Sequence, residues 1–243
     1  MLHGRFGNNI MSFDFSFYKG KKVLLTGHTG FKGSWMSVML VNAGAEVIGY
    51  SSCSKAELVT HSYKNSFFTD DRVAVSTARA GNVIGGGDFA HDRIIPDCIR
   101  AAVKHEDIIV RNPYSTRPYQ HVLEPVYAYL MIAAKQYEDH KYASWYNVGP
   151  DDQDCFQTGA LVDLFVKHWG DGLKWVNKYD GGPHEANFLK LDCSNLKNTF
   201  GWKPHWNLET AIERVVEWSK AWVAGENVRP VMDKQIKEFL EVK

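Results

Sequence analysis

The feature that most constrains the fold is a glycine-rich turn, TGHTGFKG, at residues 26–33. It places Gly27, Gly30 and Gly33 in a GxxGxxG spacing, between the apolar run KVLLT and a segment with apolar residues at helical spacing. Glycine suits such a turn because the backbone takes unusual angles, approaches phosphates closely and lets the helix pack tightly on the strand. The order strand, glycine turn, helix predicts the first unit of a dinucleotide-binding α/β domain.

The same turn predicts the cofactor. A helix that begins at these glycines presents free N–H groups and the positive end of its dipole to a pyrophosphate, so the pattern predicts a dinucleotide and leaves NAD and NADP both open. A ribose-binding carboxylate is expected about 20 residues later, but the second strand ends in GYSS and the next carboxylate is Glu57. Ser51 is the candidate ribose ligand, although capping of the next helix explains it equally well. The predicted cofactor-binding residues of the turn are Gly27, Thr29, Gly30, Phe31, Lys32 and Gly33.

The rest of the chain alternates short apolar runs with amphipathic segments, which predicts an α/β fold with a parallel sheet and a smaller mixed lobe. Strands are predicted at 22–26, 45–50, 73–80, 108–111, 145–149 and 173–178. Helices are predicted at 34–44, 55–68, 94–106, 124–137, 160–169 and 208–223. The predicted divisions are a leader at 1–18 that packs loosely or not at all, a nucleotide-binding part at 19–90, a mainly substrate-binding lobe at 91–225 with interleaved Rossmann elements, and a C-terminal tail at 226–243.

Charge and cysteine content narrow the class of protein. The 28 Lys and Arg residues balance the 28 Asp and Glu residues, so no basic surplus favours nucleic acid or an anionic membrane surface as a partner. No apolar run approaches the ~18 residues of a membrane span. The four cysteines lie far apart without a CxxC pair, which argues against a zinc site or a disulfide framework and favours the reducing cytoplasm.

Several motifs occur in one order along the chain and together carry a family resemblance. They are VLLTGHTGFKGSW, RAGNVIGGGD, DRIIPD, RNPYSTRPYQHVLEP, PHEA and LKLDCSNLKNTFGWKP. Over roughly residues 18–224 the chain resembles the extended short-chain dehydrogenase/reductases, and within that family the branch of CDP-glucose 4,6-dehydratases. The resemblance implies a Rossmann-like sheet, bound NAD, CDP-glucose as the substrate and a homodimer. It also implies a lyase reaction in which NAD takes a hydride from C4, water leaves across C5 and C6, and the hydride returns to C6.

The resemblance further implies an internal deletion near residues 50–56. In the family, several βα units separate the second strand from a catalytic YxxxK pair, whereas here Lys55 follows the strand residue Tyr50 almost at once. Each βαβ unit takes ~30 residues or more, so the missing part would hold inner strands and the residues that move protons during dehydration. A shortened sheet without these central units is therefore predicted.

The catalytic candidates at this junction are Lys55 and Tyr50. If SCSK is aligned with the family's YSxSK, Ser51 stands in the tyrosine's place and Tyr50 belongs to the strand. In the alternative, Tyr50 is the catalytic tyrosine, but a shift of one residue turns a helical side chain by about 100° away from Lys55. A solvated lysine in the first turn of a helix explains Lys55 equally well.

The predicted substrate-binding residues come from the later motifs. Arginine forks match the phosphates of a nucleoside diphosphate, so the arginines of these motifs are the phosphate candidates. The histidines and the glutamate are assigned to the base or sugar end, with a structural hydrogen-bonding role as the alternative. The set is Arg79, Asn82, Arg93, Arg111, Arg117, His121, His184 and Glu185.

Three functions remain open from the sequence. The first is a CDP-glucose dehydratase that is impaired by its shortened middle, the second a binding protein for nucleotide sugars without catalysis, and the third a different nucleotide-sugar dehydratase or epimerase. A parallel sheet without its central strands exposes apolar edges. We therefore expect the strands at 45–50 and 73–80 to become neighbours, joined by a crossover helix of sufficient length.

Overall fold

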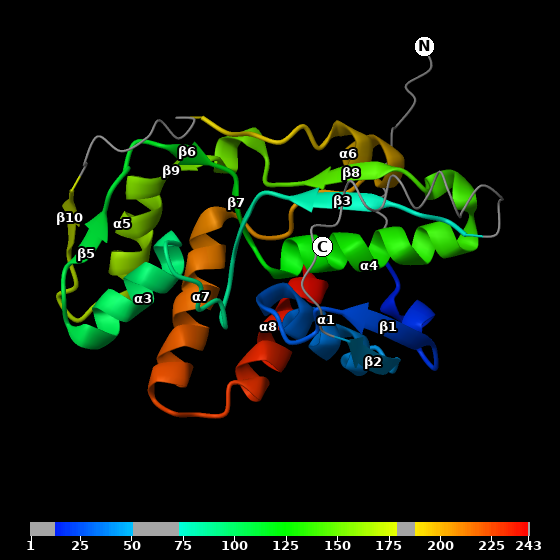
Figure 1. Cartoon of the computed structure of the whole chain (residues 1–243), viewed down its shortest axis with the longest axis horizontal. Helices are drawn as coiled ribbons and strands as arrows, with labels where there is room; N and C mark the ends of the chain where they lie inside the picture. The colour runs from blue at the N-terminus through cyan, green and yellow to red at the C-terminus, as the bar shows by residue number, and fades with distance from the viewer. Residues whose placement is uncertain (1–12, 51–72, 179–187, 243) are drawn as a thin grey trace, which may run out of the picture.

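The computed structural model describes residues 13–50, 73–178 and 188–242 (Figure 1). Its helices are α1 (Phe31–Asn42), α3 (Ile94–Lys104), α4 (Leu123–Glu138), α5 (Thr158–Trp169), α6 (Ser194–Phe200), α7 (Leu208–Val223) and α8 (Arg229–Glu241). Its strands are β1 (Lys22–Thr26), β2 (Glu46–Tyr50), β3 (Thr77–Ala80), β4 (Asn82–Ile84), β5 (Ile108–Val110), β6 (Thr116–Arg117), β7 (Tyr119–His121), β8 (Trp145–Val148), β9 (Phe156–Gln157) and β10 (Trp175–Asn177). Short 3-10 turns lie at η1 (Phe15–Tyr18), η2 (His140–Tyr142) and η3 (Asp152–Asp154). None of the helices described is long and apolar enough to cross a bilayer.

The predicted first unit, strand, glycine turn, helix and strand, is confirmed. β1 and β2 are parallel and in register from Lys22 opposite Glu46 to Thr26 opposite Tyr50. The crossover between them is α1, as expected for a βαβ unit. Tyr50 is thus the last residue of β2, which agrees with the alignment that leaves it in the strand.

The two faces of the β1–β2 ribbon differ sharply. Val23 and Leu25 pack against a core that includes the fully buried Trp35 of α1. Leu24 and Ile48, which stand opposite each other in register, are 67% and 50% exposed. Parallel sheets normally have both faces covered, so this ribbon is covered on one side only within the described part of the chain.

The expected pairing between residues 45–50 and 73–80 is wrong. β3 pairs with β8 and β4 with β7, all in parallel, and among the described strands β1 and β2 pair with each other alone. The physical reason is α4, which lies between the β1–β2 ribbon and the β3–β8 pair in Figure 1 and contacts both α1 and β8. Most of α4 from Leu123 to Ala134 is buried, so an apolar helix fills the place where direct strand pairing would occur.

The second half has a core of its own. Ile99 of α3, Phe165 of α5 and Ile212 of α7 belong to one buried cluster beneath the parallel pair β5–β10. α5 packs against both α3 and α7 (Figure 1). The predicted helices in this half are confirmed, each within a few residues of its expected ends.

The described parts of both termini are packed. The backbone N–H of Phe13 donates to Tyr127 Oη over 3.0 Å, and Tyr18 Oη donates to the Leu130 carbonyl over 2.6 Å. The expectation of a loose leader is therefore wrong for residues 13–18, because their aromatic rings extend the core against α4. The segment assigned as a tail forms α8, which buries Phe239.

Candidate functional site

The glycine turn has the geometry that its sequence predicts. Gly27 has a φ of +72°, in the left-handed region that favours glycine. A Cβ at Gly33 would lie 2.1 Å from the Gly27 carbonyl oxygen, so a side chain is excluded there. Gly30 begins α1 without a side-chain cap, which leaves the first-turn N–H groups able to bind a phosphate.

His28 is a residue of this turn that the sequence analysis did not single out. Its ring lies against Gly49 near the end of β2, where a Cβ at position 49 would meet the imidazole at 2.5 Å. His28 Nδ1 is buried and has no hydrogen-bond partner among the described residues. In a dinucleotide-binding unit the ribose lies at this end of the second strand. The His28 imidazole therefore lies at the place where a ribose-binding carboxylate was expected and the sequence has none.

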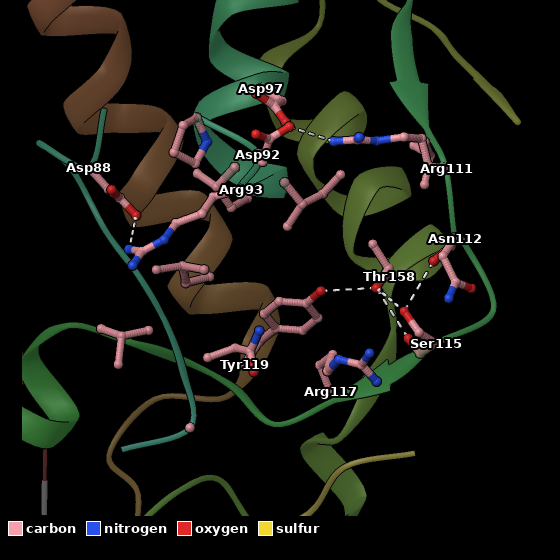
Figure 2. Close-up of a pocket in the computed structure, with 18 of the residues that line it drawn as sticks. Asp88, Asp92, Arg93, Asp97, Arg111, Asn112, Ser115, Arg117, Tyr119 and Thr158 are labelled. Carbon is pink, nitrogen blue, oxygen red and sulfur yellow. Dashed lines mark hydrogen bonds and ion pairs between the residues drawn. The ribbon is translucent and has the colours of Figure 1, made fainter. Parts of the chain in front are cut away.

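A cavity of about 780 Å³ opens beside this turn and extends into the second half (Figure 2). Phe31 and Lys32, in the first turn of α1, form one wall. β4, the loop after it and the first turn of α3 form the second wall, and the segment from β5 to β7 with the start of α5 forms the third. Residues of the predicted nucleotide-binding part and of the predicted substrate lobe thus line one space.

Two of the cavity arginines are held by aspartates. Arg93 Nη1 lies 3.0 Å from Asp88 Oδ2, and the Asp88 side chain is buried whereas that of Arg93 is 59% exposed. Arg111 Nη2 lies 2.8 Å from Asp92 Oδ1. The hydrogen bond and charge of Arg111 hold the pKa of the Asp92 carboxyl below its usual value. Both pairs are drawn in Figure 2, and both carboxylates compete with any anionic ligand for these guanidinium groups.

The floor of the cavity is closed by three hydroxyl groups. Thr158 Oγ1 at the start of α5 lies 2.9 Å from Tyr119 Oη and 3.0 Å from Ser115 Oγ (Figure 2). Thr158 also donates to the Ser115 carbonyl oxygen over 3.1 Å. Arg117 of β6 is buried on the same side of the cavity. The hydroxyl cluster fixes the strand that carries this arginine.

Apart from His121 and the turn residues Gly27, Thr29, Gly30 and Gly33, the predicted site residues fall into three groups. The cavity brings together Phe31, Lys32, Asn82, Arg93, Arg111 and Arg117. Arg79 lies exposed on β3 and does not line the cavity. Ser51, Lys55, His184 and Glu185 lie outside the described residues, as does the side chain of Tyr50.

His121 lies in the core and does not line the cavity. It is fully buried between Trp35, at 5.7 Å between ring centroids, and Trp206, at 4.9 Å. Its Nδ1 accepts the backbone N–H of Leu123 over 3.3 Å. Burial, aided by the positive charge of Arg214, lowers the pKa of His121 to about 3. A neutral imidazole that packs between two indoles fits the structural alternative for this residue.

Sequence reasoning missed the acidic and hydroxyl members of the cavity. Asp88 and Asp92 follow the glycine run 85–87 in the sequence, and that proximity to a tight loop was the available signal. The hydroxyl cluster gave no signal, because Tyr119 and Thr158 meet only after folding.

A tight loop joins the glycine-turn half to the second half. The indole Nε1 of Trp35 donates to the Gly86 carbonyl oxygen over 2.9 Å. A Cβ at Gly86 would lie 2.0 Å from the ring of Trp218, and one at Gly85 would lie 2.9 Å from the ring of Phe31. The loop therefore fits between α1 and α7 only because it lacks side chains.

Comparison with known proteins identifies the relatives of this chain. No protein-family model matches the sequence. Over 191 residues the chain is 42% identical to the CDP-glucose 4,6-dehydratase of Salmonella typhimurium, a match that covers 76% of this chain and 53% of that protein. The chain is homologous to CDP-glucose 4,6-dehydratase. It spans about half the length of this curated relative, in agreement with the predicted shortening.

Solved structures similar to this one are nucleotide-sugar epimerases and dehydratases. An epimerase from Methanothermobacter thermautotrophicus superposes with a TM-score of 0.64 at 14% identity, over 89% of this chain and 96% of that chain. The dTDP-glucose 4,6-dehydratase of Bacillus anthracis, in complex with NAD, superposes with a TM-score of 0.55 at 13% identity, over 87% of this chain and 75% of that chain. These likenesses confirm the predicted α/β fold class.

Proposed function

We propose that this chain binds CDP-glucose in the cavity beside NAD on the glycine turn, and that its dehydratase activity is impaired. The observation that carries the proposal is the cavity itself. It joins Arg93, Arg111 and Arg117 to the first turn of α1 in a space of about 780 Å³, within the size range of small-molecule sites. Guanidinium groups suit a diphosphate because each can bind two oxygens.

The residues of the turn fit NAD. Gly27 and Gly33 give the close backbone approach that a pyrophosphate requires, and Gly30 leaves the start of α1 without a side-chain cap. His28 Nδ1 is buried and has no hydrogen-bond partner among the described residues. When bound, NAD supplies hydride acceptance from the sugar. The chain's own contribution is to hold the pyrophosphate at α1 and the sugar nucleotide in the adjoining cavity.

Impairment of catalysis follows from the length of the chain. The curated relative is matched over 53% of its length. By the resemblance, the part between Tyr50 and Lys55 that this chain lacks holds the groups that move protons at C5 and C6. Without positioned acid and base groups the dehydration step loses the contribution of roughly 10²–10⁴-fold that each such group supplies.

The test is to titrate the purified chain with CDP-glucose and with NAD in a calorimeter, and to assay the same mixture for the 4-keto product. We expect both ligands to bind and no product to form. Arg117→Met is expected to weaken CDP-glucose binding by about 10- to 100-fold through loss of a charge-assisted bond, with NAD binding unchanged. Product formation contradicts the impairment, and absence of CDP-glucose binding contradicts the proposal as a whole.

Two finer points belong to the same proposal. UDP-glucose and dTDP-glucose, titrated in parallel, test the alternative of another nucleotide-sugar enzyme, and tighter binding of either would favour it.

A homodimer, which the resemblance implies, is tested by the molar mass from light scattering with and without NAD. A monomer mass under both conditions contradicts that part.

A further inference from the structure

The geometry points to Lys32 as a ligand of the substrate's diphosphate, and not of the cofactor to which its place in the glycine turn assigned it. This inference rests on the proposed function, because it needs a nucleotide with phosphate groups in the cavity. It reassigns Lys32 from the cofactor to the substrate. The first turn of α1 then contacts both NAD and the substrate.

The position of Lys32 on α1 supports the inference. Lys32 lies one residue after Phe31, whose ring contacts the Gly85 region at the edge of the cavity. Lys32 lines the cavity together with Arg93 and Arg117. Glycine backbone forms the turn itself, whereas Lys32, in the first turn of α1, is a charged residue of the cavity lining.

The charges around Lys32 also favour an anion in the cavity. Its ammonium lies 5.9 Å from the centroid of the Tyr129 ring. Partial loss of solvent around the ammonium, together with the positive charge of Arg93, lowers the pKa of Lys32. In the described part of the chain Arg93 has Asp88 as counter-ion, whereas Lys32 forms no ion pair with a carboxylate. Two neighbouring cations are stabilised when an anion binds between them.

The pyrophosphate of NAD has a site on α1 that needs no lysine side chain. Backbone N–H groups at the start of α1 and the helix dipole serve that group without a side chain. On the opposite walls of the cavity, the arginine side chains of Arg93, Arg111 and Arg117 and the uncapped first turn of α3 face the place of the substrate phosphates. One lysine on α1 therefore completes the set of cations for the substrate.

The experiment compares ligands with and without phosphate on matched variants. CDP, CMP, cytidine and NAD are titrated by calorimetry into the wild type, Lys32→Met, Lys32→Arg and Lys104→Met. Lys104 is an exposed lysine in the last turn of α3, so its variant makes the same charge change at the far end of a helix whose first turn lines the cavity. Circular dichroism melting of each variant shows that the fold is retained.

We expect Lys32→Met to weaken CDP binding by about 10- to 30-fold, the loss of one charge-assisted hydrogen bond. Cytidine and NAD affinities stay within about twofold, Lys32→Arg restores CDP binding, and Lys104→Met leaves every affinity unchanged. Equal CDP affinity in the wild type and Lys32→Met overturns the inference while the proposed function stands. A loss confined to NAD returns Lys32 to the cofactor and also overturns it. A wild type that binds no CDP overturns the inference together with the proposed function.

Discussion

The β1–α1–β2 unit and the lobe around α3, α5 and α7 differ in how completely they bury their apolar surface. In the first, Leu24 and Ile48 leave one face of a parallel ribbon open, although its other face packs against the core. In the second, Phe165 and Ile212 are fully buried in a cluster formed by helices and strands. The difference teaches that the lobe around α3, α5 and α7 has a core of its own, whereas the β1–α1–β2 unit depends on α4 and α8 for its cover.

Removing Phe165 should give the largest effect, because its ring is fully buried and stacks on Trp169 at 5.4 Å between centroids. Phe165→Ala is expected to lower the free energy of unfolding by about 3–5 kcal/mol. The matched change in the other unit, Leu24→Ala, should cost less than about 1 kcal/mol, because most of that side chain is already in water. Urea denaturation measures both, and equal losses would contradict the comparison.

A methyl group at Gly33 should damage the cofactor unit next most strongly. Its Cβ would meet the Gly27 carbonyl at 2.1 Å, so we expect Gly33→Ala to cost about 1–3 kcal/mol and to remove measurable NAD binding. Gly30→Ala is the control, since its Cβ would lie 3.3 Å from the same oxygen. Calorimetry with NAD and CDP separates the units: CDP affinity should survive in both variants, and its loss in Gly33→Ala would show that the units are not separable.

Lowering the pH should lower the free energy of unfolding through protonation of His121, which packs between the two units. This imidazole has a pKa of about 3 in the folded protein, below its unfolded value, so its contribution is present above pH 6.5 and is lost as the pH falls. Each pH unit below 6.5 then lowers the free energy of unfolding by about 1.4 kcal/mol, or about 2 kcal/mol at pH 5. His121→Asn should remove that slope from urea denaturation between pH 5 and 7, and an unchanged slope would assign it to another group.

The smallest effect is expected at the cavity floor. Thr158→Val removes the hydroxyl that meets Tyr119 and Ser115, at a cost of about 1–2 kcal/mol for groups left unsatisfied. CDP affinity should fall only a few-fold, because Arg117 keeps its charge. Thr158→Ser, which retains the hydroxyl, should restore both stability and affinity. A loss of CDP binding as large as that of Arg117→Met would make the threonine a direct ligand.

Local patterns predicted the elements well and their assembly less well. The helix at 124–137 was evident from its periodicity, but nothing in its sequence said that it would separate β2 from β3, since pairing is decided by which surfaces compete for burial. The arginines of the cavity came from motifs that occur in order along the chain. Asp88 and Tyr119 also lie in these motifs, but their roles were not predicted, because their contacts with Arg93 and Thr158 arise only when loops meet in space. α8 was missed because its apolar face is short and lies beyond the last recognised motif.

The hydrogen bond from the Trp35 indole to the Gly86 carbonyl oxygen depends in different ways on its donor residue and on its acceptor residue. Its acceptor is a main-chain carbonyl, which every amino acid at position 86 would also supply, whereas its donor is an indole encoded by a single codon. Any single-nucleotide change in that codon removes the donor, while the neighbouring ring of Trp218 restricts position 86 for a separate steric reason. Random mutagenesis should therefore break this contact in two ways: substitutions of Trp35 remove the donor, whereas substitutions of Gly86 displace the loop that carries the acceptor.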